Sequence, residues 1–236
     1  ATVDVDFLVR GLNNDLARMD EIIADILAVE TGNDFVTFKA GKTEPIAIQR
    51  KYHGVSTQIT GYIKNVRVPF NVDIGVGDVI VPSAQRRSIQ TQLEGYAKPE
   101  ILTYSLESTI AEKFDAILQR FELTGRMKDF YDLWFLMHHY AFKMASLQEA
   151  IRQTFERRGT SPGKYVSLRN ADFIDSHQPE WATYVTKLKS ATYMRKPKVE
   201  LPVKDFATVM ADILEWLGPV MEQSAYASWK PGRGWR

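Results

Sequence analysis

The feature that most constrains the fold is a change in the spacing of apolar residues close to Ser105. Before this point the chain is rich in β-branched and aromatic residues broken by tight-turn signals, whereas after it the apolar residues recur at helical spacing. Strands followed by helices predict an α+β protein with a mixed or antiparallel sheet, because alternating βαβ units would interleave the two patterns. We expect an α/β core over residues 1–99 and a helical region over residues 100–236.

This pattern also predicts individual elements. Residues 2–9 alternate apolar and polar side chains, as a strand does, and an asparagine at 13 or 14 should cap a helix that runs to about residue 29. Strands joined by tight turns should fill residues 35–81, and a loop with a short helix should follow over residues 82–99. The later helices are expected at approximately 105–123, 127–140, 146–158, 177–191 and 203–221.

Composition limits the classes of protein to consider. The chain has 236 residues, no cysteine and a formal net charge of +1. Disulfides and thiolate ligands are therefore excluded, and no stretch approaches the roughly 18 apolar residues of a membrane span. The phosphate loop, the nucleophile elbow and the His-Glu-x-x-His helix do not occur, which removes the main support for NTPase, hydrolase and metalloprotease classes. We expect a cytoplasmic protein with no membrane partner.

Two stretches carry acids on expected strands. Asp4 and Asp6 lie two residues apart and so share one face of the first strand, and Asp73 follows Val72 in a later strand that ends among glycines. If the two strands are neighbours, three carboxylates converge and can hold one or two Mg²⁺ ions, which prefer oxygen ligands. From the spacing alone, a solvated polar face explains the pattern equally well, because exposed strands alternate in this way.

The helix after Ser105 places Lys113 and Arg120 together along one edge of its apolar stripe. Lys113 can bind nucleotide phosphates as a point charge. The residues alone favour a plainer interpretation, in which the stem of Lys113 packs on the stripe while its ammonium group stays in water.

The next expected helix is apolar around most of its circumference, so its acids Asp129 and Asp132 each need a cation, a hydrogen-bond donor or a metal. Lys128 can pair with Asp132 across one turn. Asp129 has no such local partner, which makes it a candidate for a functional site. His138 and His139 are adjacent and point about 100° apart, so they cannot chelate a metal together.

The closing stretch, residues 228–236, contains two tryptophans, three cations and no acid. This composition suits stacking on single-stranded nucleic acid and neutralising its phosphates. A frayed terminal tail is the simpler interpretation.

Three blocks of the chain together resemble the AbiEii/AbiGii-type toxin family of nucleotidyltransferases. Residues 2–7, Thr-Val-Asp-Val-Asp-Phe, are similar to the family's Asp-x-Asp strand, and residues 72–75, Val-Asp-Ile-Gly, stand in the position of its later acidic strand. The third and most specific block joins the helix with Ala-Glu-Lys at residues 111–113 to Arg-x-Lys-Asp-x-x-Asp-Leu at residues 126–133. The resemblance extends over roughly residues 2–140 and implies a fold like that of polymerase-β-like nucleotidyltransferases.

The resemblance also implies an activity. Family members act as toxins of toxin–antitoxin or phage-defence systems, and some relatives transfer nucleotides from an NTP to tRNA ends. By this analogy the chain is a Mg²⁺-dependent nucleotidyltransferase whose partners are an NTP, an RNA acceptor such as tRNA, and a cognate antitoxin. The residues implied are Asp4, Asp6 and Asp73 as metal ligands, Lys113 and Arg120 as nucleotide contacts, and Asp129 and Asp132 as further members of the reaction centre.

The chain departs from the family pattern at its start. The family's acidic strand is preceded by a helix and a Gly-Gly-Thr segment that approaches the triphosphate, whereas this sequence begins at Ala1. Glycine-rich turns donate backbone N–H groups to phosphates, so we expect half of the phosphate cradle to be missing and the transfer activity to be weak. Two alternatives stay open: a catalytically inactive relative that binds nucleotide, RNA or protein, and a phosphotransferase that uses the same acids.

Overall fold

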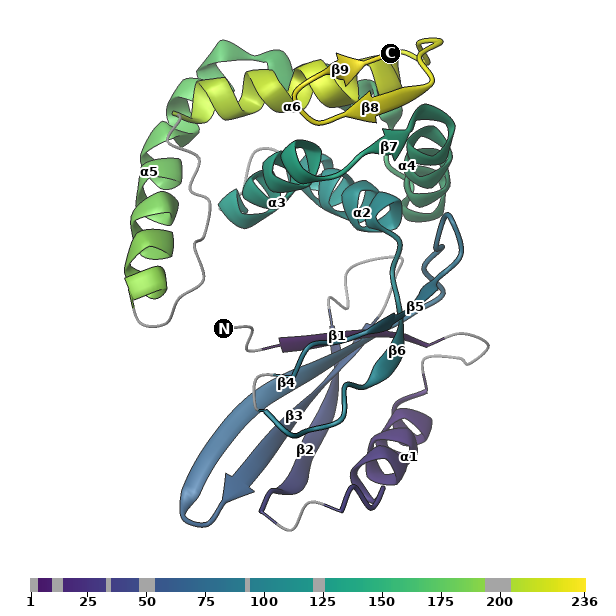
Figure 1. The fold of residues 1–236 in the computed structure, drawn as a ribbon, viewed down its shortest axis with the longest axis vertical. Coiled ribbons are helices and arrows are strands. Elements are labelled where there is room, and N and C mark those ends of the chain that lie inside the picture. Colours follow the sequence, from purple (N-terminus) through teal and green to yellow (C-terminus); the bar gives the residue numbers. More distant parts are fainter. Residues whose placement is uncertain are drawn as a thin grey trace. The chain divides into compact units, whose positions relative to one another are not determined.

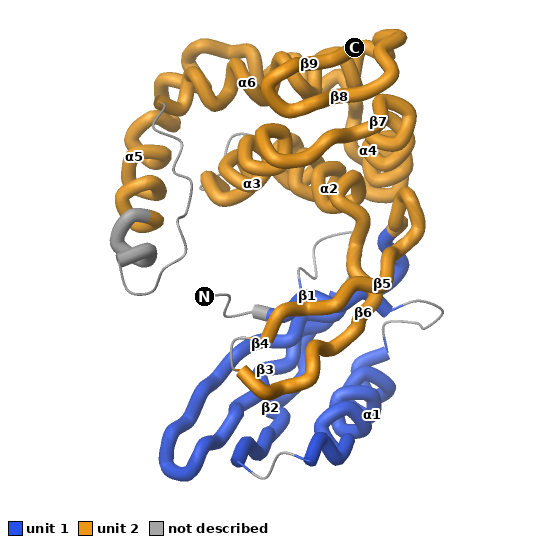
Figure 2. Tube along the Cα trace, viewed as in Figure 1, with its two compact units in different colours: residues 1–78 blue, residues 79–236 orange. Residues whose placement is uncertain are grey.

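The computed structural model describes residues 4–9, 15–32, 35–46, 54–91, 94–120, 126–193 and 205–236, drawn as a ribbon in Figure 1. The chain forms two compact units, residues 1–78 and residues 79–236, which Figure 2 colours separately. The first unit holds a sheet and a helix, and the second holds a hairpin, further helices and a small C-terminal sheet. None of the helices in the described stretches combines the length and hydrophobicity needed to span a bilayer.

The sheet of the first unit is mixed. Its strands are β1 (Asp4–Val9), β2 (Thr37–Ile46), β3 (Gly54–Ile63) and β4 (Val66–Val76), in the order β1-β4-β3-β2. β2, β3 and β4 are antiparallel neighbours, whereas β1 pairs in parallel with β4. The parallel pairing brings the first strand of the unit beside its last one.

Helix α1 (Leu16–Leu27) packs on one face of this sheet (Figure 1). The helix begins after Asp15, whose carboxylate accepts a hydrogen bond from the Ala17 amide as an N-cap. Its apolar stripe buries Met19 and Ile23. The sheet residues buried in the same cluster are Val55, Ile59, Val72 and Ile74. Side chains alternate along a strand, so the residues between these ones belong to the face opposite α1.

The second unit starts with a hairpin and continues with helices. The hairpin pairs β5 (Gln85–Ser88) with β6 (Glu100–Thr103), and nearly all of their side chains are exposed. The helices are α2 (Leu106–Gln119), α3 (Met127–His139), α4 (Met144–Arg158), the 3-10 helix η1 (Pro162–Arg169), α5 (Ala171–Tyr193) and α6 (Phe206–Met221). Ser105 caps α2 with its side chain, and Gly159 ends α4 in the left-handed conformation that glycine tolerates best.

The helices of the second unit share one large core. Phe130 of α3 lies against Phe206 of α6, with ring centroids 5.1 Å apart, and Phe206 also contacts Trp181 of α5 at 5.6 Å. All three rings are buried. Buried aromatic side chains remove the largest apolar areas from water, so this core dominates the stability of the unit.

A three-stranded antiparallel sheet completes the second unit. Its strands, in spatial order, are β7 (Phe142–Lys143), β8 (Ser228–Lys230) and β9 (Gly234–Trp235). Trp229 is buried and donates its indole N–H to the carbonyl of Met137 at 2.7 Å. Trp235 donates its indole N–H to the carbonyl of Trp216 at 2.8 Å. The frayed-tail interpretation is therefore wrong, and the two tryptophans expected to stack on nucleic acid are anchored in the protein.

The α+β class expected from the sequence is confirmed, with strands first and most helices afterwards. Residues 82–99 differ from the expectation, because their described part contributes β5 and no helix. A hairpin exposed on both faces has no apolar alternation that would reveal it. The unit boundary falls after Asp78, whereas the sequence suggested residue 99. The asparagines expected to cap the first helix lie outside the described residues, and the cap observed is Asp15.

Candidate active site

The acids of the first unit come from neighbouring strands. β1 and β4 pair with Asp6 opposite Asp73, and this register places both side chains on the same face of the sheet. That face is the one opposite α1, since Val72 and Ile74, on either side of Asp73, are buried against the helix. Asp6 is exposed and Asp73 is half-buried. The two strands are thus neighbours, as a shared metal site requires.

A serine on the next strand orients Asp73. Ser56 of β3 lies opposite Asp73 and donates its hydroxyl to Asp73 Oδ1 at 2.5 Å. A carboxylate has two acceptor oxygens, so this bond fixes the side chain without using Oδ2. Gly75 carries no side chain on the same face, and a Cβ there would lie 3.5 Å from Asp78 Oδ2. Neither Ser56 nor Asp78 was predicted as a site residue. Strand register brings Ser56 to Asp73, and Asp78 lies just after the end of β4.

Asp4 extends the acidic face, since it lies two residues before Asp6 on β1. Its backbone pairs with Asn71, two residues before the pair of Asp6 and Asp73, so it belongs to the same face. Its side chain lies outside the described part of the structure. Among the side chains that are described, no group of three or more acids or histidines is arranged to hold a metal. The described part of the site is therefore a pair of opposed carboxylates, with Asp4 as the predicted third.

In the second unit, α2 and α3 bring Lys113 between two acids. Lys113 Nζ lies 3.1 Å from Asp129 Oδ1 and 2.5 Å from Asp132 Oδ2. The acids are one helical turn apart on α3, so a single ammonium group reaches both. The side chain of Asp129 is 5% exposed and that of Asp132 is 25% exposed. Asp132 was expected to pair with Lys128; its cation comes from the preceding helix instead.

Arg126 completes this cluster from the start of α3. Its guanidinium forms an ion pair with Asp129 through Nε. Asp129 also lies in the first turn of α3, where the partial positive charge of the helix end favours an acid. Arg126 was not predicted as a site residue, although a cation three residues before a buried acid is a recognisable helical pair. Two cations and two acids thus neutralise one another.

The acids of the cluster stabilise the protonated forms of their neighbours. Burial opposes the charge of Lys113, but the hydrogen bond and charge of Asp132, with those of Asp129, outweigh it and raise the pKa of Lys113 above its ordinary value of 10.5. Burial, and after it the charge of Asp132, raises the pKa of the Tyr184 hydroxyl on α5. Both groups keep their protons at neutral pH, so neither suits a general base.

Arg120, expected to contact nucleotide, is exposed at the C-terminal end of α2. It lies seven residues after Lys113, which is about two helical turns, so both residues are on the same side of the helix. Its contact with nucleotide stays a prediction.

Another buried acid, Asp115 on α2, was not predicted. Asp115 is 1% exposed; Thr160 donates its hydroxyl to the carboxylate, and Arg158 lies 3.3 Å from it. Arg158 also lies 3.4 Å from Glu112. Burial raises the pKa of Asp115, although the hydrogen bond from Thr160 and the charge of Arg158 oppose the shift. This cluster joins α2 to the end of α4, which indicates a structural role.

Comparison with known families decides the assignment. The sequence model of the family described as nucleotidyl transferase AbiEii toxin, of type IV toxin–antitoxin systems, matches residues 1–211. The chain belongs to this family. AbiEii membership supports a nucleotidyltransferase toxin with a cognate antitoxin, which is the coarse form of the function expected from the sequence. The matched stretch contains the acids of the first unit and the cluster around Lys113, and it ends within α6.

Two solved structures from Helicobacter pylori are similar to this AbiEii chain. JHP933 is 15% identical, with 94% of this chain and 75% of that one covered and a TM-score of 0.37. A candidate nucleotidyltransferase is 16% identical, with 94% and 77% covered and a TM-score of 0.37. No curated protein matches the chain. The assignment therefore rests on the family match.

Proposed function

We propose that this AbiEii toxin transfers a nucleotidyl group from an NTP to a hydroxyl group of RNA in a Mg²⁺-dependent reaction. The observation that carries the proposal is the register of β1 and β4, in which Asp6 stands opposite Asp73 on the face opposite α1. Neighbouring strands lie about 4.8 Å apart, a separation at which two carboxylates can bind one hard cation.

The residues fit a magnesium ion. Mg²⁺ takes oxygen ligands, usually one or two carboxylates together with water and substrate phosphates. Asp6 and Asp73 supply two carboxylates. Asp4 would supply a third, since it lies two residues before Asp6 on the same face. When bound, the ion would neutralise charge on the triphosphate and polarise its phosphoryl oxygens.

The protein's own residues would position the reactants. Ser56 keeps Asp73 oriented through its hydroxyl group. An ammonium group has three donors, of which Asp129 and Asp132 engage two in Lys113, so we keep Lys113 as a proposed contact to a phosphate oxygen. Arg120 is the second proposed phosphate contact. The acceptor hydroxyl would release its proton to water and bond to the α-phosphorus as the bond to pyrophosphate breaks. Positioning and charge neutralisation would supply most of the rate.

RNA is the proposed acceptor, with tRNA as the first candidate, because some relatives of the family that the chain resembles transfer nucleotides to tRNA ends. NTPs and tRNA are both abundant in the cytoplasm, which agrees with the expected location. The proposed protein partner is the cognate antitoxin that family membership implies.

The test is incorporation of labelled nucleotide into RNA by the purified chain, with and without Mg²⁺. Asp6→Asn and Asp73→Asn should each reduce incorporation at least a hundredfold, since ligand loss removes several kcal/mol of charge stabilisation. Glu44→Gln is the matched control, because Glu44 lies opposite Ser56 on the same face but on the outer strand β2. Its incorporation should match that of the unaltered chain.

Other outcomes of the incorporation assay would indicate a different function. Metal-dependent consumption of NTP without a labelled RNA product would indicate a phosphotransferase, to be identified by product analysis. Nucleotide or RNA binding without any turnover would indicate an inactive relative. Full incorporation by the Asp6→Asn and Asp73→Asn variants would remove the proposed metal site.

A further inference from the structure

The C-terminal sheet has a basic side that the proposed active site does not use. In its register Lys143 of β7 pairs with Ser228 of β8, and Ser228 exchanges backbone hydrogen bonds with Arg236 at 3.0 and 3.1 Å. These three residues therefore form one row across the sheet. Phe142, Trp229 and Trp235 form the neighbouring row, which points the other way, into the core. The row with Lys143 and Arg236 consequently faces outward.

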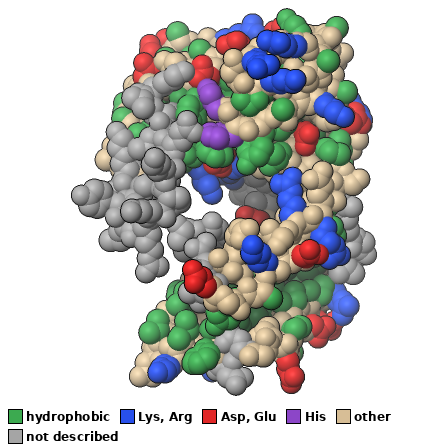
Figure 3. Space-filling model, viewed as in Figure 1, with side chains coloured by type: hydrophobic (Ala, Val, Ile, Leu, Met, Phe, Trp, Pro, Cys, Tyr) green, Lys and Arg blue, Asp and Glu red, His purple; other side chains and the backbone are tan. Residues whose placement is uncertain are grey.

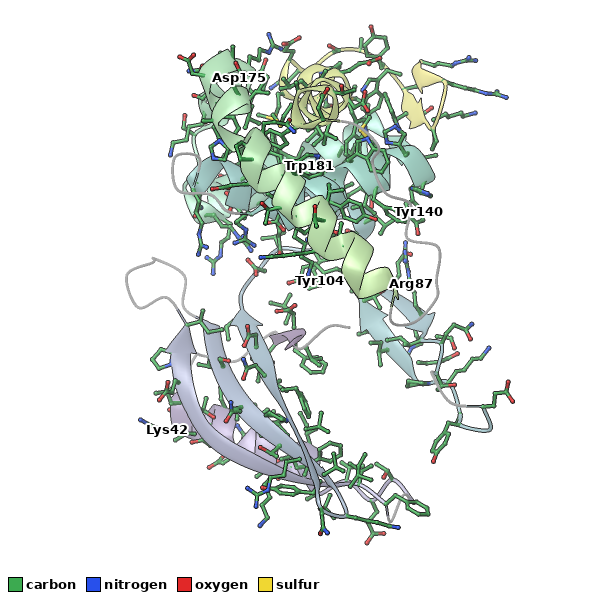
Figure 4. The ribbon with its side chains drawn as sticks, turned by 90° about the vertical axis from the view of Figure 1, so that its left-hand side faces the viewer. Lys42, Arg87, Tyr104, Tyr140, Asp175 and Trp181 are labelled. Carbon is green, nitrogen blue, oxygen red and sulfur yellow. The ribbon has the colours of Figure 1, made fainter. Side chains whose placement is uncertain are left out.

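Two further cations join this row. Lys230 alternates with Trp229 along β8 and so belongs to the outward side, and Arg233 lies in the turn between β8 and β9. We call Lys143, Lys230, Arg233 and Arg236 the basic face; all four are exposed, and their strands and turn carry no acid. Figure 3 shows Lys and Arg side chains gathered over the β8–β9 hairpin, and Figure 4 shows nitrogen-tipped side chains projecting away from the C-terminal strands.

An aromatic stack runs from the core side of the same sheet to the surface just before β8. Trp229 contacts Trp235 with ring centroids 5.6 Å apart, and Trp235 in turn stacks with Tyr226 at 6.4 Å and 21° between the planes. Exposure rises along the stack, from 5% for Trp229 to 47% for Tyr226. The outermost ring is held in place by a ring that the core anchors through a hydrogen bond to Trp216. Tyr226 is therefore an exposed ring that a partly buried ring supports, and it lies two residues before β8, the strand that carries Lys230.

We infer that the basic face and Tyr226 bind single-stranded RNA. Cations spaced along one side of a sheet suit a phosphate backbone, and an exposed ring just before one of its strands suits the stacking of a base. The two features together characterise single-strand binding. An acidic peptide would use the cations but would gain little from the ring. The family match ends at residue 211, so β8 and β9 lie beyond the part of the chain that it covers.

This inference deepens the proposed function, on which it rests for the identity of the ligand, because it names a surface that would hold the RNA acceptor. Binding can nevertheless be measured without NTP or Mg²⁺. A failure of nucleotide transfer therefore leaves the binding result intact, and a failure of binding leaves transfer to be judged by its own assay.

The experiment measures fluorescence anisotropy of a labelled oligouridine of about 12 nucleotides, titrated with the full chain over a series of salt concentrations. The Lys230→Glu/Arg233→Glu variant should bind at least tenfold more weakly. Its slope of log affinity against log salt should fall by about 1.4, since each lost single-strand phosphate contact accounts for about 0.7. The matched control is Lys98→Glu/Lys164→Glu, which changes the net charge equally at two exposed lysines outside the sheet and should retain most of the affinity.

Tyr226 provides an independent arm. Tyr226→Ala should weaken binding at least fivefold with little change in salt slope, because a base stacked on an aromatic ring contributes about 1–3 kcal/mol. Tyr226→Phe should bind like the unaltered chain. Thermal melts followed by tryptophan fluorescence show whether each variant is folded.

Several results would overturn the inference. One is the absence of RNA binding by the unaltered chain, and another is equal weakening by the control pair, which would indicate a general charge effect. A third is displacement of the RNA by polyglutamate together with unchanged binding by Tyr226→Ala, which would indicate an acidic-peptide surface instead.

Discussion

The two units of this AbiEii chain place aspartates in opposite settings. In the first unit, Asp6 and Asp73 lie on the sheet face that turns away from a small core, in which the described structure buries six hydrophobic residues. In the second unit, Asp129 and Asp115 are buried beside a core of 28 such residues and are neutralised by cations from other helical positions.

This difference separates two uses of the same side chain. A buried charge must be compensated within the fold, so its removal costs stability. A carboxylate on an exposed sheet face costs the fold little and can accept an external ligand. Substitution of the exposed aspartates of the first unit should therefore change function, and substitution within the buried ion pairs of the second unit should change stability.

The chain offers a convenient way to measure the two responses separately. All five tryptophans belong to the second unit; they are Trp134, Trp181, Trp216, Trp229 and Trp235. Tryptophan fluorescence during urea unfolding thus reports the second unit alone, and amide hydrogen exchange in β3 and β4 reports the first.

The largest expected effect comes from the aromatic core. Phe130→Ala should lower the free energy of unfolding of the second unit by about 3–5 kcal/mol, because it empties a fully buried site between Phe173 and Phe206. Phe35→Ala in the first unit is the matched control, since that ring is 72% exposed. The free energy of opening that amide hydrogen exchange measures in β3 and β4 should change by no more than about 0.5 kcal/mol. Equal losses for the two variants would contradict the comparison.

The next effect comes from the buried ion pairs. Lys113→Met should destabilise the second unit by about 3 kcal/mol, because Asp129 then loses one of its two cations inside the protein. Adding Asp129→Asn should restore part of the loss, since the uncompensated buried charge is gone. Urea titrations of the single and double variants provide the measurement. A stable Lys113→Met variant with weakened NTP binding would show that the lysine serves the ligand and not the fold.

A smaller effect is expected from pH. The folded-state pKa of Asp115 is raised above its ordinary value of 3.8, so the folded chain binds this proton more tightly than the unfolded chain does. The contribution of Asp115 to stability should therefore fall as pH rises from 3.8 through the raised value. Asp115→Asn lacks this titration. The stability of the unaltered chain minus that of the variant should decrease between pH 3 and neutral pH, and an increase would mean that the pairing with Arg158 outweighs burial.

Local signals explain how much of the fold was predictable. The first residue of α3, Met127, was expected from helical periodicity, and the end of α4 at Arg158 follows from Gly159. Helix α5 begins at Ala171, six residues before the expected start, because Asn170 accepts a hydrogen bond from the Asp172 amide at 2.8 Å and acts as a cap. That signal was present in the sequence and was overlooked.

Long-range pairing explains what was not predictable. The partner of Asp132 is Lys113, on another helix, and no local pattern connects the two. The C-terminal stretch pairs with residues 142–143, which are still more remote in the chain, so its burial could not be read from composition. The alternation around Asp6 and Asp73 placed each acid on a strand face, but only the observed register places the two opposite each other.

The smallest expected change in stability accompanies the largest expected change in ligand binding. The Asp6→Asn/Asp73→Asn variant should change the free energy of opening, measured by hydrogen exchange in β3 and β4, by no more than about 0.5 kcal/mol. Asp6 is exposed, and an asparagine keeps the shape of the strand. Ser56 can still donate its hydroxyl to the amide oxygen at position 73.

Isothermal titration with Mn²⁺, a spectroscopic and thermodynamic substitute for Mg²⁺, tests the central claim most directly. The unaltered chain and the Glu44→Gln control should bind the metal, and the Asp6→Asn/Asp73→Asn variant should lose measurable binding while its sheet stays folded. Unchanged Mn²⁺ affinity in this folded double variant would contradict the assignment of the metal site to the opposed carboxylates of β1 and β4.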